Sequence, residues 1–142
     1  MPKSRRSRVS FTTPDEIVVK RKAVPHEFVL DALTELEPWT RHMFSCLAVY
    51  VGEKILLALR DRPNYTGDNG IWIATTIEHH KSLKQELPNM RSIGVLGKDA
   101  TGWQILPADA PDFEESAFHV CELILDGDPR IGKNPKSKKR RK

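Results

Sequence analysis

The stretch that decides the fold reads Phe44-Ser-Cys-Leu-Ala-Val-Tyr-Val51, then Gly52-Glu53, then Lys54-Ile-Leu-Leu-Ala-Leu-Arg60. Both runs are rich in aliphatic and aromatic side chains that favour β-strands. A Gly-X pair between two such runs is typical of a β-hairpin, because glycine supplies the positive φ of a type II′ turn. The sequence therefore predicts two antiparallel strands near 43–51 and 54–60.

The segments on either side of this hairpin add a helix before it and a strand and a helix after it. Pro25 and Pro38 bracket a run with helical apolar spacing, which predicts a helix over 26–37. The polar loop 61–70 leads to a short strand over 71–74. Thr75-x-x-Glu78 has the pattern of a capping box, so a second helix is expected from there to Leu87.

The last part of the domain predicts a second hairpin and a third helix. The runs 92–96 and 103–106 are the two strands, with a turn over 97–102. Asp109 is the expected N-cap of a helix that ends before Gly127. Its apolar stripe comprises Phe113, Ala117, Val120, Cys121 and Ile124. The order α-β-β-β-α-β-β-α predicts an α+β fold, with a five-stranded, mainly antiparallel sheet and helices on one face.

Charge divides the 142-residue chain into three parts. Residues 1–22 carry a net charge of +5, residues 23–129 a net charge of −9, and residues 130–142 a net charge of +8. Blocks of like charge with few apolar residues repel themselves and do not fold. We therefore expect a basic disordered arm over 1–22, one folded domain over 23–129, and a basic disordered tail over 130–142.

Several classes of protein are excluded by composition. The apolar runs are shorter than the ~20 residues of a membrane span. The start of the chain, Met1–Arg6, is not followed by an apolar stretch, so we expect no secretory signal peptide. Two cysteines, Cys46 and Cys121, make no disulfide framework, which indicates a reducing, cytoplasmic setting. Because the apolar runs are short, we also expect no membrane partner.

A set of residues around the first hairpin is similar to the start of the TfoX N-terminal domain family, whose pattern is Arg-x-Met-Phe-Gly-Gly followed by an aromatic residue and Gly-Lys at the turn. The matching residues are Arg41, Met43, Phe44, Tyr50, Gly52 and Lys54. Leu106-Pro107 and the acidic run 109–115 match the family's ending, so the resemblance covers about 26–127. Ser45-Cys46 stand in place of the paired glycines, and 61–70 is an extra segment.

The resemblance implies a secretion-chaperone-like α+β fold, shared with YjbR-like proteins. It also implies a regulatory role, since TfoX-like proteins are associated with the regulation of competence genes and YjbR-like proteins are often described as DNA-binding. The resemblance implies no shared catalytic residues.

The residues themselves also give little sign of catalysis. His79 and His80 are adjacent, so on a helix they point about 100° apart rather than chelating one metal as an i, i+4 pair does. His119 lies between Glu115 and Glu122 at helical spacing, which indicates a surface pair. Cys46 and Cys121 are expected to be buried and inert. We therefore expect no enzyme, no catalytic residue, no metal site and no cofactor.

The basic arms are the predicted contact with nucleic acid, either DNA or RNA. The cations concerned are Arg5, Arg6, Arg8, Lys136, Lys138, Lys139, Arg140, Arg141 and Lys142. They would neutralise phosphates and read little sequence. Arg60, Arg62 and Tyr65 form a possible recognition loop, although a polar loop of this composition is commonly just solvated.

A second class of function stays open. The domain could be a protein–protein interaction, dimerisation or adaptor module, with arms that serve only solubility or targeting. The two classes differ in whether removal of the arms abolishes nucleic-acid binding.

Overall fold

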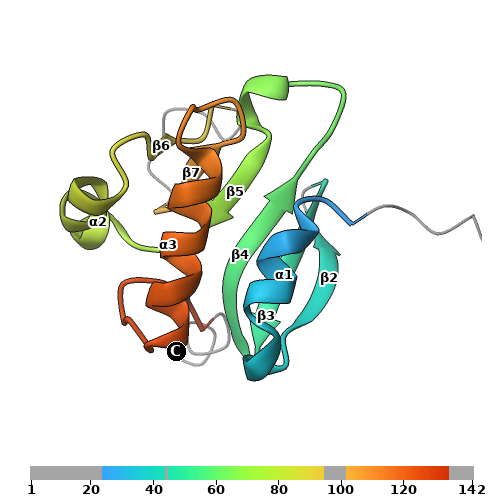
Figure 1. Ribbon diagram of the computed structural model, residues 1–142, viewed down its shortest axis with the longest axis vertical. Coiled ribbons are helices and arrows are strands. Elements are labelled where there is room, and N and C mark those ends of the chain that lie inside the picture. Colours follow the sequence, from blue (N-terminus) through green and yellow to red (C-terminus); the bar gives the residue numbers. More distant parts are fainter. Residues whose placement is uncertain (1–23, 44, 95–101, 135–142) are drawn as a thin grey trace, which may run out of the picture.

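The computed structural model describes residues 24–43, 45–94 and 102–134. One antiparallel sheet has the strand order β2-β3-β4-β5-β7-β6. The strands are β2 (Trp39–Met43), β3 (Cys46–Val51), β4 (Lys54–Arg60), β5 (Gly70–Ile73), β6 (Arg91–Ser92) and β7 (Gln104–Pro107). The helices are α1 (Glu27–Ala32), α2 (His80–Glu86) and α3 (Phe113–Leu125), with the short 3-10 helices η1 (Thr34–Leu36), η2 (Thr66–Asp68) and η3 (Ile77–His79). The predicted α+β class is confirmed (Figure 1).

The hairpin of β3 and β4 is confirmed at the centre of this sheet. Val51 pairs with Lys54 across a two-residue turn, and Gly52 adopts the positive φ of 62° that the turn requires. From Ile55 to Arg60 every residue of β4 is buried. A strand that is buried on both faces requires apolar side chains to pack against each face, and other elements of the fold supply them.

The prediction of five strands is wrong, because the sheet has a sixth strand, β2, at its edge. β2 pairs with β3 from Trp39↔Tyr50 to Met43↔Cys46. Its residues are exposed except for half-buried Met43, so the alternation that marks a strand with one buried face is missing. The chain turns sharply before β3, where Ser45 has φ 62°. Phe44, predicted as part of the first strand, lies outside the described residues.

All three helices contribute to one apolar core on the same face of the sheet. Side chains of α1 (Val29), α2 (Leu83) and α3 (Val120) belong to a single buried cluster. The strands supply Leu47, Val49, Leu57, Leu59, Ile71, Ile73 and Leu106 to it. Figure 1 shows α1 and α3 lying across the sheet, and ring contacts of Phe28 with Phe113 and Phe118 join these two helices. The predicted packing of the helices on one face is therefore observed in this core.

The opposite face of the sheet is lined by small and aromatic side chains. Ala48, Ala58, Trp72 and Ile105 alternate with the helix-side residues and are buried. Trp103 packs against the clusters at both ends of this face. Its indole also lies beneath the Lys133 ammonium, 5.7 Å from nitrogen to ring centroid.

The helix boundaries differ from the sequence prediction in their caps. Thr75 and Glu78 form no capping box, because the Thr75 hydroxyl donates to the carbonyl of Arg130 at 2.6 Å and Thr76 is the N-cap of η3. The N-cap of α3 is Asp112 rather than Asp109. The Thr75 hydroxyl thus makes a tertiary hydrogen bond to Arg130 instead of capping the helix that follows it. Within the described residues, no helix combines the length and the apolar character needed to cross a bilayer.

Residues 130–134, predicted as part of the tail, belong to the folded domain. Lys133 and Ile55 exchange two backbone hydrogen bonds of 2.9 Å, and the Gly132 N–H donates to the Ala74 carbonyl at 2.7 Å. Ile131 is buried in the helix-side core. The domain therefore continues to at least Asn134. The predicted arm over 1–22 and residues 135–142 of the tail lie outside the described residues.

Replacing Ile131 by alanine should lower the free energy of unfolding by about 2–4 kcal/mol, because it opens a cavity in a closed core. Urea denaturation followed by circular dichroism measures this. Ile77→Ala is the matched control, since Ile77 is exposed and its loss should cost about 0.5 kcal/mol or less. Equal losses in the two variants would show that residues 130–134 do not contribute to the core.

Candidate functional site

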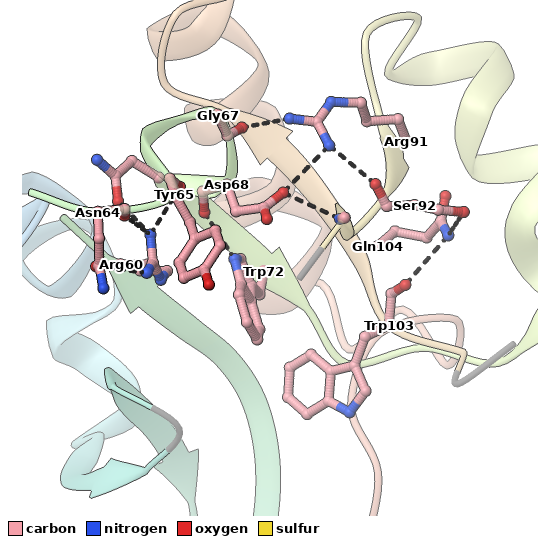
Figure 2. A network of polar contacts seen from close by, with 12 residues as sticks. Arg60, Asn64, Tyr65, Gly67, Asp68, Trp72, Arg91, Ser92, Trp103 and Gln104 are labelled. Atoms are coloured by element: carbon pink, nitrogen blue, oxygen red, sulfur yellow. Dashed lines mark hydrogen bonds and ion pairs between the residues drawn. The ribbon is translucent and has the colours of Figure 1, made fainter. Parts of the chain in front are cut away.

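Arg60, at the end of β4, holds the following loop together from inside. Its side chain is only 3% exposed. One guanidinium nitrogen, Nη1, donates to the carbonyls of Asn64 (3.1 Å) and Tyr65 (3.0 Å) and to Asn69 Oδ1 (2.8 Å). The other, Nη2, donates to Asn64 Oδ1 at 3.2 Å. Figure 2 shows the guanidinium next to Asn64 and Tyr65 of the loop. Arg60 is therefore a structural residue of the loop.

Asn69 closes the base of the loop. Its side-chain oxygen accepts the Arg62 N–H at 2.8 Å, and its amide nitrogen donates to the Arg62 carbonyl at 2.9 Å. Next to it, Gly70 has φ 146°, and a Cβ there would lie 2.1 Å from the Leu106 carbonyl oxygen. Glycine is thus required for the loop to return into the sheet so close to β7.

Asp68 attaches the far side of the loop to β5 and to the segment after β6. The buried carboxylate accepts the Gly94 N–H at 3.0 Å and a weak contact from Arg91 Nη1 at 3.4 Å. The Asp68 carbonyl accepts the Trp72 indole N–H at 3.0 Å, and Arg91 Nη2 donates to the carbonyl of Gly67. As Figure 2 shows, the loop is held by arginines on both sides.

The loop presents two side chains outward. Tyr65 is 66% exposed and has φ 46°, a left-handed conformation that is strained for a bulky residue. Arg62 is also exposed. Strain of this kind persists only where surrounding bonds enforce it, and it is common at binding sites. Of the three predicted loop residues, Arg62 and Tyr65 are therefore available to a ligand. Arg60 differs from them in that its guanidinium donates to acceptors inside the loop, and its predicted contact with a ligand stays a prediction.

Beside the loop, a cleft of about 260 Å³ lies between the start of α1 and the β2–β3 turn. His26, His42, Cys46 and Arg62 are among its lining residues. Burial raises the pKa of the Cys46 thiol to about 11, against a smaller opposing effect of Arg60 and Arg62. The thiol is therefore protonated at neutral pH and is a poor nucleophile. In the described part of the chain, no three or more His, Cys, Asp or Glu side chains form a group that could hold a metal ion.

The groove between α2 and α3 is acidic. It has a volume of about 600 Å³ and is lined by Glu86, Asp112, Glu115 and Glu122 among others. His119 bridges Glu86 at 2.8 Å and Glu122 at 3.9 Å, so its main partner is on α2 rather than on its own helix. The adjacent histidines also diverge as expected, since His80 bonds the Gly102 carbonyl (2.9 Å) and His79 contacts Glu78 (3.5 Å).

Arg130 links this acidic region to the C-terminal segment. Its Nη2 lies 2.8 Å from Glu86 Oε2 and 2.7 Å from Asp128 Oδ2. The hydrogen bond from Arg130 lowers the pKa of Asp128 to about 2. The pKa of Glu86 is also lowered, first by the His119 hydrogen bond and then by that from Arg130. Ionised Glu86 and Asp128 therefore hold Arg130 in place.

A stack of exposed Trp39 on buried Tyr50 was missed by the sequence reasoning. Trp39 on β2 lies over Tyr50 on β3, with ring centroids 4.2 Å apart and an interplanar angle of 12°. The stack depends on the cross-strand pair Trp39↔Tyr50, which exists only once β2 is known to be a strand. The aromatic and β-branched residues at 39 and 40 were the available signal.

Comparisons with known proteins identify no relative: no family model, no curated protein and no solved structure matches the chain. The similarity to TfoX N-terminal domains therefore stays a prediction. The predicted arm cations, Arg5, Arg6, Arg8, Lys136, Lys138, Lys139, Arg140, Arg141 and Lys142, lie outside the described residues.

Arg60→Met should lower the free energy of unfolding by about 1–3 kcal/mol, because loop carbonyls and the Asn69 oxygen lose their donor while the aliphatic stem is kept. Guanidinium denaturation measures the loss. Arg62→Met is the matched control and should change stability by about 0.5 kcal/mol or less, since this side chain is exposed. If both variants are equally stable, Arg60 does not organise the loop.

Stability should fall as pH drops from about 5 to 2, in part through Asp128. A carboxyl with a folded pKa of about 2 and a reference value of 3.8 stabilises the native state when ionised, and this contribution disappears on protonation. Arg130→Met removes the cause of the shift, so its free energy of unfolding should fall less over this range. Denaturation at several pH values tests this, with Arg62→Met as control. Parallel pH profiles for wild type and Arg130→Met would contradict the assignment.

Proposed function

We propose that this chain is a non-enzymatic regulatory module, resembling TfoX N-terminal domains, that contacts nucleic acid through its basic terminal segments. The observation that carries the proposal is the segregation of charge between the folded domain and its ends. The sequence predicts a domain that ends at residue 129, whereas the described fold continues to Asn134. With the domain taken as residues 23–134, its net charge is −7, and residues 135–142 have a net charge of +6. Residues 1–22 add +5.

Cations gathered outside an acidic domain are suited to polyanions. Each can approach a phosphate and release its condensed counterion, which gives affinity that decreases steeply with salt. Contacts to phosphates carry no sequence information by themselves. The acidic α2–α3 groove repels a duplex, so the domain would be held with that face turned away.

The fold supports this arrangement by holding the residues that directly precede the basic segment. Arg130, Ile131 and Lys133 are held by ion pairs, core burial and backbone pairing, respectively. The six cations Lys136, Lys138, Lys139, Arg140, Arg141 and Lys142 follow directly in the sequence. A polyanion bound to them is therefore kept close to the domain.

The second candidate function is a protein-interaction or dimerisation module, with arms that serve solubility or targeting. The observation that favours it is the edge position of β2, which among the described residues pairs with β3 alone and is mostly exposed. Free strand edges can pair with another chain.

Deleting residues 135–142 should weaken binding to nucleic acid and flatten its dependence on salt. Each neutralised phosphate contributes roughly 0.7–0.9 to the slope of log K against log salt, so losing six cations should lower the slope by up to about 5. Fluorescence anisotropy with a labelled DNA duplex and a labelled single strand at several salt concentrations gives both quantities.

The deletion begins at 135 so that the contacts of residues 130–134 are kept, and its melting temperature should match that of the full chain. A full-length variant with the six cations replaced by glutamine is the matched control for chain length. If either variant binds as tightly as wild type with the same salt slope, the C-terminal cations are not the contact.

A further inference from the structure

The Trp39–Tyr50 stack is a rigid aromatic surface at the edge of the sheet. The Trp39 indole N–H donates to the Gly52 carbonyl at 2.8 Å, which fixes the orientation of the ring. One face of the indole covers the Tyr50 ring, which is buried. Trp39 nevertheless remains 43% exposed, although one face of its indole is covered.

A cation is built into the same stack. Arg41 Nη2 donates to the Tyr50 hydroxyl at 2.9 Å, and the guanidinium carbon lies 5.2 Å from the Tyr50 ring centroid. Arg41 is itself exposed, as are Thr40 and His42 on the same strand. The Trp39 ring and the Arg41 guanidinium thus lie close together in fixed orientations. Binding a ligand would therefore cost little side-chain conformational entropy.

Lys133, near the end of the described residues, lies in the same row of the sheet as the stack. Trp39 pairs with Tyr50, Tyr50 with Ile55, and Ile55 with Lys133 on the other side of β4. At about 4.8 Å between strands, Lys133 and Trp39 are roughly 14 Å apart. Eight residues follow Asn134, and at about 3.3 Å per residue they can span roughly 26 Å. The terminal cations can therefore reach the surroundings of the stack.

We propose that Trp39 is a base-stacking platform and that the ligand of this protein is single-stranded nucleic acid. A base of the strand stacks on the free face of the indole and a neighbouring phosphate meets Arg41, while the terminal cations keep the role that the proposed function gives them. This inference rests on the proposed function and narrows its ligand.

The geometry favours a single strand over a duplex. Bases inside a duplex are stacked on one another and offer no free face, whereas those of a single strand do. Exposed aromatic rings combined with cations along the backbone are the common means of binding single strands, with little sequence preference. A platform at the sheet edge also lies away from the acidic groove, which Phe118 and other residues of α2 and α3 line.

The test compares full-length wild type with Trp39→Ala and Trp39→Phe. The probes are a fluorescein-labelled 15-mer of thymidine, a DNA hairpin with the same number of phosphates, and inorganic polyphosphate as a polyanion without bases. Trp39→Ala should bind the 15-mer about 5- to 100-fold more weakly, because one base loses its aromatic partner. Its binding to polyphosphate and its salt slope should not change. Trp39→Phe keeps a ring and should recover most of the affinity.

Two further readouts separate stacking from other causes. The 15-mer should quench the intrinsic fluorescence of wild type, and this quenching should be lost in Trp39→Phe, since Trp72 is buried and Trp103 packs against the sheet. Phe118→Ala is the matched control for an exposed aromatic, because Phe118 is 47% exposed on α3. It should bind the 15-mer as wild type does.

The outcomes distinguish this inference from the proposed function. If Trp39→Ala binds the 15-mer as wild type does while the deletion of 135–142 weakens binding, the platform is wrong and the role of the basic segment stands. If the deletion has no effect but Trp39→Ala does, the platform stands and the role of the basic segment is wrong. If Trp39→Ala changes the oligomeric mass measured by analytical ultracentrifugation but not the affinity for the 15-mer, the β2 edge binds a second copy of the chain. That result would overturn the platform.

Discussion

The rest of the structure depends on the burial of β4 on both of its faces. From Ile55 to Arg60 no residue of this strand meets solvent to a significant extent. Leu57 and Leu59 require an apolar cover on one side, and α1, α2 and α3 supply it. Ala58 faces the other side, where its small side chain leaves space that Trp72 and Trp103 occupy. Even Arg60, at the end of the strand, is buried because the following loop folds around its guanidinium.

The same strand links the fold to the proposed function. At one end, Arg60 holds the loop that presents Arg62 and Tyr65 outward. At the other end, Ile55 pairs with Lys133, which lies three residues before Lys136, the first of the predicted C-terminal contact residues. Arg130 strengthens this attachment through Glu86 and Asp128. Glu86 and Asp128 thus bind Arg130, and Glu86 also binds His119, so the acidic domain holds the start of the C-terminal segment in a defined place.

The edge strand β2 brings together the two functional classes that the sequence left open. An exposed edge is suited to pairing with another chain, and an exposed aromatic stack is suited to nucleobases. The fixed orientation of Trp39, its partner Tyr50 and the nearby Arg41 favour the second use. Exposed charged residues such as Arg41 also discourage unwanted strand pairing, so this side chain would suit the proposed ligand and protect the strand edge.

The sequence by itself determined the elements whose signals are local: the Gly52 turn, the strands on each side of it, the apolar stripe of α3 and the segregation of charge. Tertiary structure decided what local patterns do not encode. β2 is held by pairing along one edge, so its residues need no apolar alternation. Thr75 bonds the carbonyl of Arg130 instead of capping its own helix, and Ile131 fills a core formed by distant segments. Arg60 turns inward for the same reason, since a buried guanidinium is stable only where folding places several acceptors around it.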